Sequence, residues 1–117
     1  MTAPVYTTLI SVAQLQALHA SGAPVLVFDC SFDLMNPAAA DALFAQTRIA
    51  GAVQAHLDRN LSTHDSALAV NAGRHPLPQR EAVAAWLGQI GLNNNMQAVV
   101  YDRNGANYCG RLWWMLK

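Results

Sequence analysis

Asp102 heads the stretch of this chain that is best placed to do chemistry. It directly follows the apolar run of residues 98–101 (A-V-V-Y), and the turn formers Asn104 and Gly105 come after it. A short apolar run of this kind is typical of a strand buried on both faces, and ligands of open α/β sheets bind beyond the carboxyl ends of such strands. A loop that leads into a helix also presents unpaired backbone N–H groups. The pattern therefore predicts an anion cradle over residues 102–107.

The carboxylate of Asp102 has two interpretations. It can cap its own loop by accepting backbone N–H bonds. It can also be a phosphoacceptor of the kind found in response-regulator receivers, with Asp29 as a metal-binding neighbour, but such a site needs a later lysine on another strand. The only lysine is the terminal Lys117. The sequence therefore favours the loop cap, and it predicts neither a metal nor a nucleotide cofactor.

The cysteines and the loop histidines give weaker indications. Cys109 is expected in the first turn of a helix, where the helix dipole can lower the pKa of a thiol, so it is an alternative nucleophile as well as a packing residue. Cys30 follows a buried strand and is interpreted as a packing residue. His56, His64 and His75 lack zinc-like spacing and a cysteine pair, so they are expected to be surface residues of a loop.

Two arginines flank the loop and are the candidates for binding a small anion. Arg103 and Arg111 could hold such an anion at an interface with a second domain. Salt bridges within the domain would use the same side chains equally well. The sequence leaves both roles open.

The elements that must position these residues alternate between strand and helix. Strands are predicted over residues 25–28, 49–53 and 98–101, and helices over 12–20, 37–46 and 78–90 and again after the loop. Ser11 and Asn36 are the predicted N-caps of the first two helices, and Gly91 is the predicted stop of the third. Residues 54–78 have no sustained periodicity and are expected to cross the surface. The alternation predicts a parallel α/β sheet, in which Asp29 and Asp102 share one edge.

Composition limits the classes of partner. The chain has 117 residues, of which 53% are hydrophobic and 12% charged, and its net charge is zero. No charge run favours nucleic acid or an anionic membrane, and no apolar stretch approaches the ~18 residues of a membrane span. Residues 1–4 (M-T-A-P) do not resemble a signal peptide, and the two cysteines fit no disulfide scaffold. We expect a single cytoplasmic domain that binds neither nucleic acid nor membrane.

The end of the chain is unusually apolar. Trp113 and Trp114 lie on the last helix, and the sequence stops three residues later at Lys117. Such a helix normally packs beneath further elements, because two exposed tryptophans form a hydrophobic patch that promotes association. We therefore expect residues 1–117 to be one domain that is incomplete at its C-terminus and lacks a last strand and helix.

Five motifs, in this order and spacing, resemble the N-terminal rhodanese-like domain of the tandem-domain thiosulfate and 3-mercaptopyruvate sulfurtransferases. They are V-L-V-F-D-C-S, R-I-A-G-A-V followed by H-L-D, R-H-P-L-P, A-V-V-Y-D and the terminal R-L-W-W-M-L. One departure is the segment 48–52 (R-I-A-G-A), where the family usually has His-Ile-Pro-Gly-Ala. The resemblance implies a three-layer fold, with a parallel sheet and helices on both of its faces.

The resemblance also implies a division of labour between two repeats. In this family sulfur moves to cyanide or a thiol through a cysteine persulfide, and the cysteine heads a loop of the C-terminal repeat. Here Asp102 occupies the corresponding position, and a carboxylate cannot form a persulfide. The chain is thus expected to have no catalytic residue and to be inactive alone, with a C-terminal rhodanese domain as partner and a small sulfur-containing anion at their interface near Arg103 and Arg111. The alternative is a stand-alone, non-catalytic rhodanese-like binding or regulatory module.

Overall fold

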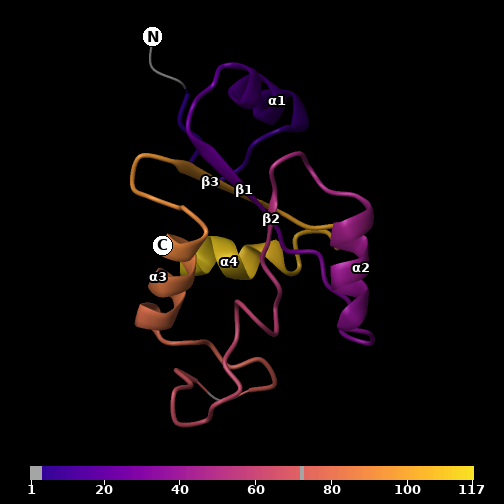
Figure 1. The fold of residues 1–117 in the computed structure, drawn as a ribbon, viewed down its shortest axis with the longest axis vertical. Helices are drawn as coiled ribbons and strands as arrows, with labels where there is room; N and C mark the ends of the chain where they lie inside the picture. The colour runs from indigo at the N-terminus through magenta and orange to yellow at the C-terminus, as the bar shows by residue number, and fades with distance from the viewer. Residues whose placement is uncertain (1–3, 72) are drawn as a thin grey trace.

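The structure is a computed structural model that describes residues 4–71 and 73–117. Within these residues, three strands and four helices alternate along the chain (Figure 1). They are α1 (Val12–Ala20), β1 (Val25–Asp29), α2 (Ala38–Gln46), β2 (Val53–Gln54), α3 (Arg80–Gln89), β3 (Gln97–Tyr101) and α4 (Cys109–Met115).

The three strands form one parallel sheet in the order β2-β1-β3. β1 pairs with β3 along its whole length, from Val25 opposite Gln97 to Asp29 opposite Tyr101. The predicted parallel sheet is confirmed, and the carboxyl ends of β1 and β3 lie side by side. Asp29 and Asp102 therefore meet at the same edge of the sheet.

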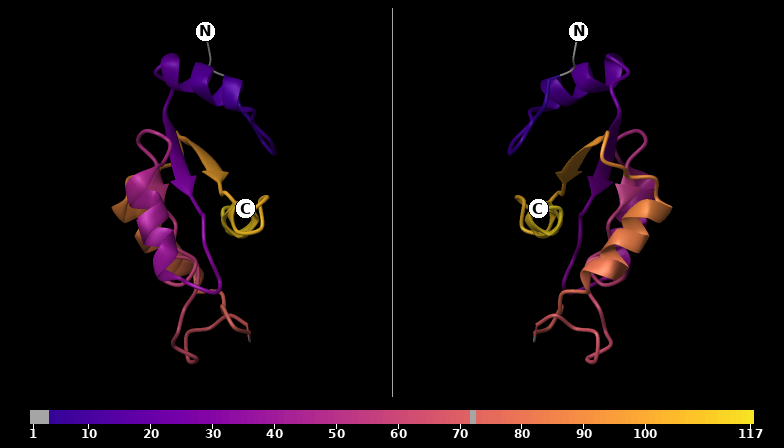
Figure 2. Two further views of the ribbon diagram at one scale, coloured as in Figure 1. Left: turned by 90° about the vertical axis from the view of Figure 1, so that its right-hand side faces the viewer. Right: turned by 90° about the vertical axis from the view of Figure 1, so that its left-hand side faces the viewer.

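Helices cover both faces of the sheet, as the alternating side chains of its buried strands require. Phe28 and Leu112 belong to one buried cluster, against which Trp86 of α3 packs. Val27 and Val99 belong to a second cluster on the opposite face, with α1 and Phe44 of α2. Figure 1 shows the sheet between α3 and α2, and the two opposite views of Figure 2 bring α2 forward in one and α3 in the other. The predicted three-layer arrangement is confirmed.

Helix α1 begins where its capping residues predict. The Ser11 side chain accepts from the Gln14 N–H at 3.1 Å, and the Gln14 side chain accepts from the Ser11 N–H at 2.8 Å. This reciprocal pair satisfies two backbone donors that a helix start leaves unpaired. Leu15 and Leu18 are buried on the inner face of the helix.

Three predicted boundaries were wrong by one to four residues. The second strand begins at Val53 rather than Ile49, because Gly51 has φ +78° and the Ala52 N–H donates to the Ile49 carbonyl in a turn. Helix α2 starts at Ala38, and no side chain caps it, so Asn36 is not its N-cap. Helix α3 begins at Arg80 instead of in the turn at Pro78.

The segment after β2 is only partly a surface excursion. Leu57 and Leu61 are among its buried side chains, and both belong to the core cluster beneath α4. Their neighbour His56 is only 4% exposed, which corrects the expectation that it is a surface histidine. Aperiodic segments can still supply core residues, and this one closes the carboxyl edge of the sheet.

Within the described part of the chain, no helix is long and apolar enough to cross a membrane.

Candidate functional site: the loop after β3

The carboxylate of Asp102 accepts four backbone N–H bonds from its own loop. Its Oδ1 atom accepts from Asn104 at 2.8 Å and from Ala106 at 2.9 Å. Its Oδ2 atom accepts from Tyr108 and Cys109, both at 2.8 Å. The prediction that Asp102 caps its own loop is confirmed, and both carboxylate oxygens are fully engaged.

The backbone of the loop curls tightly around this carboxylate. Gly105 and Ala106 both have φ +68°, in the left-handed region. Glycine adopts this conformation freely, whereas alanine does so at a cost of about 1–2 kcal/mol. The hydrogen bonds from Ala106 and its neighbours to a charged acceptor offset that cost. The loop is therefore a cradle of N–H groups that is already filled by a side-chain anion.

Hydrogen bonding stabilises the ionised form of Asp102. Partial burial by itself raises the pKa of this carboxyl group, but the four backbone N–H donors outweigh burial and hold the pKa below its ordinary value. A negative charge is thus fixed at the carboxyl end of β3 at neutral pH.

Cys109, at the start of α4, is not an activated thiol. Burial raises its pKa to about 11, and the negative charge of Asp102 acts in the same direction. Of the two roles left open for Cys109, the structure supports the packing residue, because burial and then the Asp102 carboxylate raise its pKa where the helix dipole alone could have lowered it. Cys30 is 1% exposed, and burial raises its pKa as well. Both cysteines are free and pack in the same core cluster.

A second, buried network joins the ends of β1 and β3. Asp29, which is 1% exposed, accepts from the Ser31 N–H at 2.9 Å and from the Tyr101 hydroxyl at 2.9 Å. The Arg103 Nη2 atom lies 3.4 Å from the Asp29 carboxylate and also donates to the Thr47 carbonyl. Arg103 therefore forms a salt bridge within the domain. Its contacts fix the segment after α2 against the sheet.

Arg111 lies in a different environment from Arg103. Its guanidinium donates to the His75 carbonyl at 2.6 Å and lies 3.5 Å from the Ser62 hydroxyl, and both of these acceptors are neutral. Its Nε atom is buried and has no hydrogen-bond partner within residues 4–71 and 73–117. Burial lowers the pKa of Arg111. The described part of the chain thus gives this cation no carboxylate, and the two arginines do not share one anion site.

The long segment brings two histidines to this edge. His75 Nδ1 lies 3.1 Å from Asp58 Oδ1, and the two side chains are 23% and 25% exposed. His56 Nδ1 accepts from the N–H groups of Asp58 and Arg59 at 3.1 and 3.3 Å, so this ring is a structural acceptor. Both rings pack edge-on against Phe32. The Asp58–His75 pair could not be predicted from the sequence, because the 16 intervening residues lack any regular pattern.

No group of three or more His, Cys, Asp or Glu residues that could hold a metal ion occurs among the described residues. Chemically, the described residues at this edge of the sheet are a capped carboxylate (Asp102), a cation without a carboxylate partner among them (Arg111) and an imidazole–carboxylate pair (His75 and Asp58). It offers no accessible nucleophile with a lowered pKa.

Comparisons with known proteins agree with the resemblance seen in the motifs. No family model matches the chain. It is 36% identical over 104 residues to a probable 3-mercaptopyruvate sulfurtransferase of Pseudomonas aeruginosa, a match that covers 89% of this chain and 36% of that protein. It is 33% identical over 108 residues to SseB of Mycobacterium tuberculosis, which is named as a thiosulfate sulfurtransferase by inference. That match covers 92% of this chain and 37% of SseB.

The fold has a solved counterpart. The 3-mercaptopyruvate sulfurtransferase of Leishmania major superimposes with a TM-score of 0.72 at 27% sequence identity, over 86% of this chain and 27% of that one. The chain spans a little over a third of the length of the curated relatives from Pseudomonas and Mycobacterium. The comparisons of sequence and of structure thus both find sulfurtransferases.

Proposed function

We propose that this chain, a homologue of the 3-mercaptopyruvate and thiosulfate sulfurtransferases with a rhodanese-like fold, is the non-catalytic N-terminal rhodanese domain of a cytoplasmic sulfurtransferase. A C-terminal rhodanese domain of the same protein supplies the cysteine that carries sulfur as a persulfide. The present chain forms one wall of the active-site cleft. By itself it transfers no sulfur.

The observation that carries this proposal is the filled cradle at Asp102. Four backbone N–H groups of the loop already bind the Asp102 carboxylate at 2.8–2.9 Å. A persulfide-forming thiolate would need those donors, and a carboxylate oxygen cannot take its place in sulfur transfer. The nearest thiol, Cys109, has a pKa raised to about 11, so it is almost entirely protonated at neutral pH.

We assign the binding of the small anionic sulfur donor to Arg111 rather than to Arg103. Arg103 already forms a salt bridge with the buried Asp29 carboxylate, whereas the acceptors that Arg111 contacts in the described part of the chain are neutral. A partly buried guanidinium without a counter-ion attracts an anion, because both charges are weakly screened there. Arg111 thereby becomes the contribution of this chain to an anionic substrate at the domain interface.

Anion binding by Arg111 can be measured directly on the chain. Titration with thiosulfate, followed by amide chemical shifts, is expected to move the signals of Ser62 and Arg111. The shifts should weaken at least tenfold in Arg111→Gln and persist in the matched control Arg80→Gln, because Arg80 is an exposed residue at the start of α3. Equal titration of all three proteins would contradict the assignment.

The inactivity of the chain is tested with thiosulfate and 3-mercaptopyruvate as donors and cyanide as acceptor. The purified chain should form thiocyanate no faster than buffer does. Turnover that disappears in Cys109→Ser would overturn the proposal and move the nucleophile to Cys109. The gene sequence beyond codon 117 separates a two-domain sulfurtransferase, with a cysteine-headed loop in its second repeat, from a stand-alone binding module.

A further inference from the structure

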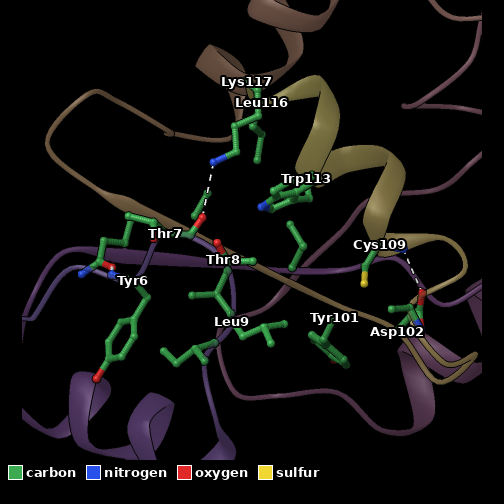
Figure 3. A pocket seen from close by; sticks show the side chains of 16 residues that line it. Tyr6, Thr7, Thr8, Leu9, Tyr101, Asp102, Cys109, Trp113, Leu116 and Lys117 are labelled. Atoms are coloured by element: carbon green, nitrogen blue, oxygen red, sulfur yellow. Dashed lines mark hydrogen bonds between the residues drawn. The ribbon is translucent and has the colours of Figure 1, made fainter.

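The loop after β3 leaves the backbone amide of Gly105 free. Asp102 Oδ1 accepts from the Asn104 N–H at 2.8 Å and from the Ala106 N–H at 2.9 Å. The N–H of Gly105, between them, donates to no acceptor within the described part of the chain, and Gly105 is exposed. Figure 3 shows the Asp102 side chain in this loop, with the bond from Cys109 as a dashed line. The carboxylate therefore fixes the amides on either side of Gly105 but not the Gly105 amide itself.

The side-chain amide of Asn104 is held through its oxygen alone. Its Oδ1 atom accepts from the Phe32 N–H at 3.3 Å, whereas its Nδ2 atom has no hydrogen-bond partner among the residues that the structure describes. A donor on a carbonyl oxygen makes the carbonyl carbon more electrophilic, because it stabilises the negative charge that develops when a nucleophile adds. The Asn104 Cγ atom is thus polarised, and its NH2 group is free to leave.

Glycine at position 105 keeps the approach to that carbon open. It has no side chain that could obstruct its own nitrogen. Gly105 has φ +68°, and a Cβ atom added there would meet no other atom within 4 Å. This side of the turn is therefore open to water. A free amide nitrogen, an unhindered approach and a polarised side-chain carbonyl occur together at two consecutive residues.

We infer that Asn104 is a site of spontaneous deamidation in the folded protein. After hydroxide removes the Gly105 N–H proton, the amide nitrogen attacks Asn104 Cγ. The Cγ–Nδ2 bond breaks, and the departing nitrogen takes up a proton and leaves as ammonia. Water then opens the resulting five-membered succinimide by adding to one of its two carbonyl carbons. The product is aspartate, or isoaspartate where the main chain now runs through the side chain.

The reaction requires only water and the residues of one loop. Nothing is oxidised or reduced in it. The inference is independent of the proposed function, since it holds whether or not the chain belongs to a two-domain sulfurtransferase.

Asn107, in the same loop, lacks this combination of features. The residue after it is Tyr108, whose N–H donates to Asp102 Oδ2 at 2.8 Å. The Tyr108 ring packs against Phe32, with ring centroids 5.5 Å apart. The nitrogen that would attack Asn107 is therefore engaged, and it carries a bulky, anchored side chain. Asn107 is the internal reference for Asn104.

The two products affect the loop differently. Aspartate retains an oxygen for the Phe32 N–H and adds one negative charge to a chain whose formal net charge is zero. Isoaspartate adds a methylene group to the main chain between the N–H groups of residue 104 and Ala106, which both donate to Asp102 Oδ1. These two donors can then no longer keep their present spacing. Isoaspartate formation should thus loosen the cap that Asp102 places on the loop.

Mass spectrometry of the incubated, purified chain tests the inference. Trypsin releases residues 104–111, and fragment ions of this peptide should show conversion at Asn104 while Asn107 stays intact. At neutral pH, the rate in the folded protein should equal or exceed the rate in the same protein unfolded by urea. A reaction confined to the unfolded fraction would be slower in native buffer, in proportion to that fraction. A native rate below the urea rate by more than about threefold would overturn the inference.

Gly105→Ala tests the chemical route. The added methyl group hinders the attacking nitrogen, while the backbone tolerates alanine, since Ala106 already has φ +68°. Conversion at Asn104 should fall about tenfold or more, a change of at least ~1.4 kcal/mol in the barrier. It should fall in urea as well, so the result does not depend on the folding of the variant. The matched control Gly110→Ala, where an added Cβ also meets nothing within 4 Å, should leave the rate unchanged. An unchanged rate in Gly105→Ala would mean that water hydrolyses the amide directly, and it would overturn the succinimide route.

Discussion

At the scale of single residues, the Asp102 side chain takes the place of a bound anion: it accepts the backbone N–H bonds that an empty loop would offer to one. Its two oxygens saturate four backbone donors, and its charge raises the pKa of the adjacent Cys109. The same side chain therefore stabilises the loop and suppresses its nucleophilic chemistry. The Asp102 carboxylate is therefore the cause both of the loop's stability and of its lack of a reactive thiol.

Replacing Asp102 by Asn should destabilise the fold in a manner that depends on pH. The amide keeps the size but has one acceptor oxygen, so it leaves two N–H donors unpaired and costs roughly 1.5–3 kcal/mol at pH 7, the scale of hydrogen bonds to a charged group. The folded-state pKa of Asp102 is lowered, so its stabilisation is present above the unfolded value of about 3.9 and is lost as the pH falls through the folded value. In urea unfolding, the difference in free energy of unfolding between the two proteins should shrink as the pH falls below the unfolded-state pKa of about 3.9 and further through the folded-state value.

The matched control for this comparison is Asp33→Asn. Asp33 is exposed and accepts a single backbone bond, from Met35 at 2.9 Å. Its substitution should change the free energy of unfolding by less than about 1 kcal/mol at any pH. A pH-independent loss in Asp102→Asn, or an equal loss in both variants, would mean that the charge of Asp102 does not stabilise the loop.

Residue type and local spacing were sufficient to predict Asp102 as a loop cap, because all of its partners lie within seven positions. They were insufficient for Asp29, which meets Tyr101 and Arg103 only after 72 and 74 positions of chain. They were equally insufficient for Asp58 and His75. Contacts of this kind depend on strand order and on an aperiodic segment, and single-sequence patterns encode neither.

At the scale of elements, the periodic segments were predictable and the irregular ones were not. β1, β3 and α1 follow from apolar patterns and the N-cap residue Ser11, whereas β2 has two residues and is specified only by its pairing with β1. The buried residues Leu57 and Leu61 lie in a segment without periodicity, so the sequence could not mark them as core. The candidate loop was found because it lies between two of the predictable elements.

The loop after β3 should keep its shape when its anion is changed. In Asp102→Cys, built in the Cys109→Ser background, the introduced thiol would head a cradle of four backbone N–H groups. Such donors stabilise a thiolate, so its pKa should fall well below the free value of ~8.5. The measurement is the rate of alkylation by iodoacetamide as a function of pH, followed by mass spectrometry.

The remaining Cys30 is the internal reference for that titration, because it is 1% exposed and burial raises its pKa. It should stay unmodified over the range in which the introduced thiol reacts. An alkylation profile that titrates at the free value of ~8.5 would show that the cradle forms only around the native carboxylate.

At the scale of the whole molecule, one side of the sheet is closed and the other is open. β2 and the segment after it cover one side of β1, while β3 has no strand beyond it within the described residues. The exposed apolar surface of α4 continues this open side. An unpaired edge beside apolar side chains is a site for association with another chain.

Trp113 and Trp114 should make the isolated chain of residues 1–117 self-associate. They are 40% and 61% exposed, and they lie about 100° apart on α4, so one neighbouring element cannot cover both from a single side. Full burial of a large aromatic side chain is worth about 2–3 kcal/mol, so uncovered tryptophans favour any contact that hides them. Sedimentation should show concentration-dependent oligomers, and a hydrophobic dye should bind.

Trp114→Gln should reduce both effects without lowering the free energy of unfolding, whereas Val12→Gln, at a 76% exposed position on α1, should leave them unchanged. A monodisperse monomer with a sharp, reversible thermal transition and quencher-protected, blue-shifted tryptophan emission would contradict this prediction and would mean that the chain covers both tryptophans by itself.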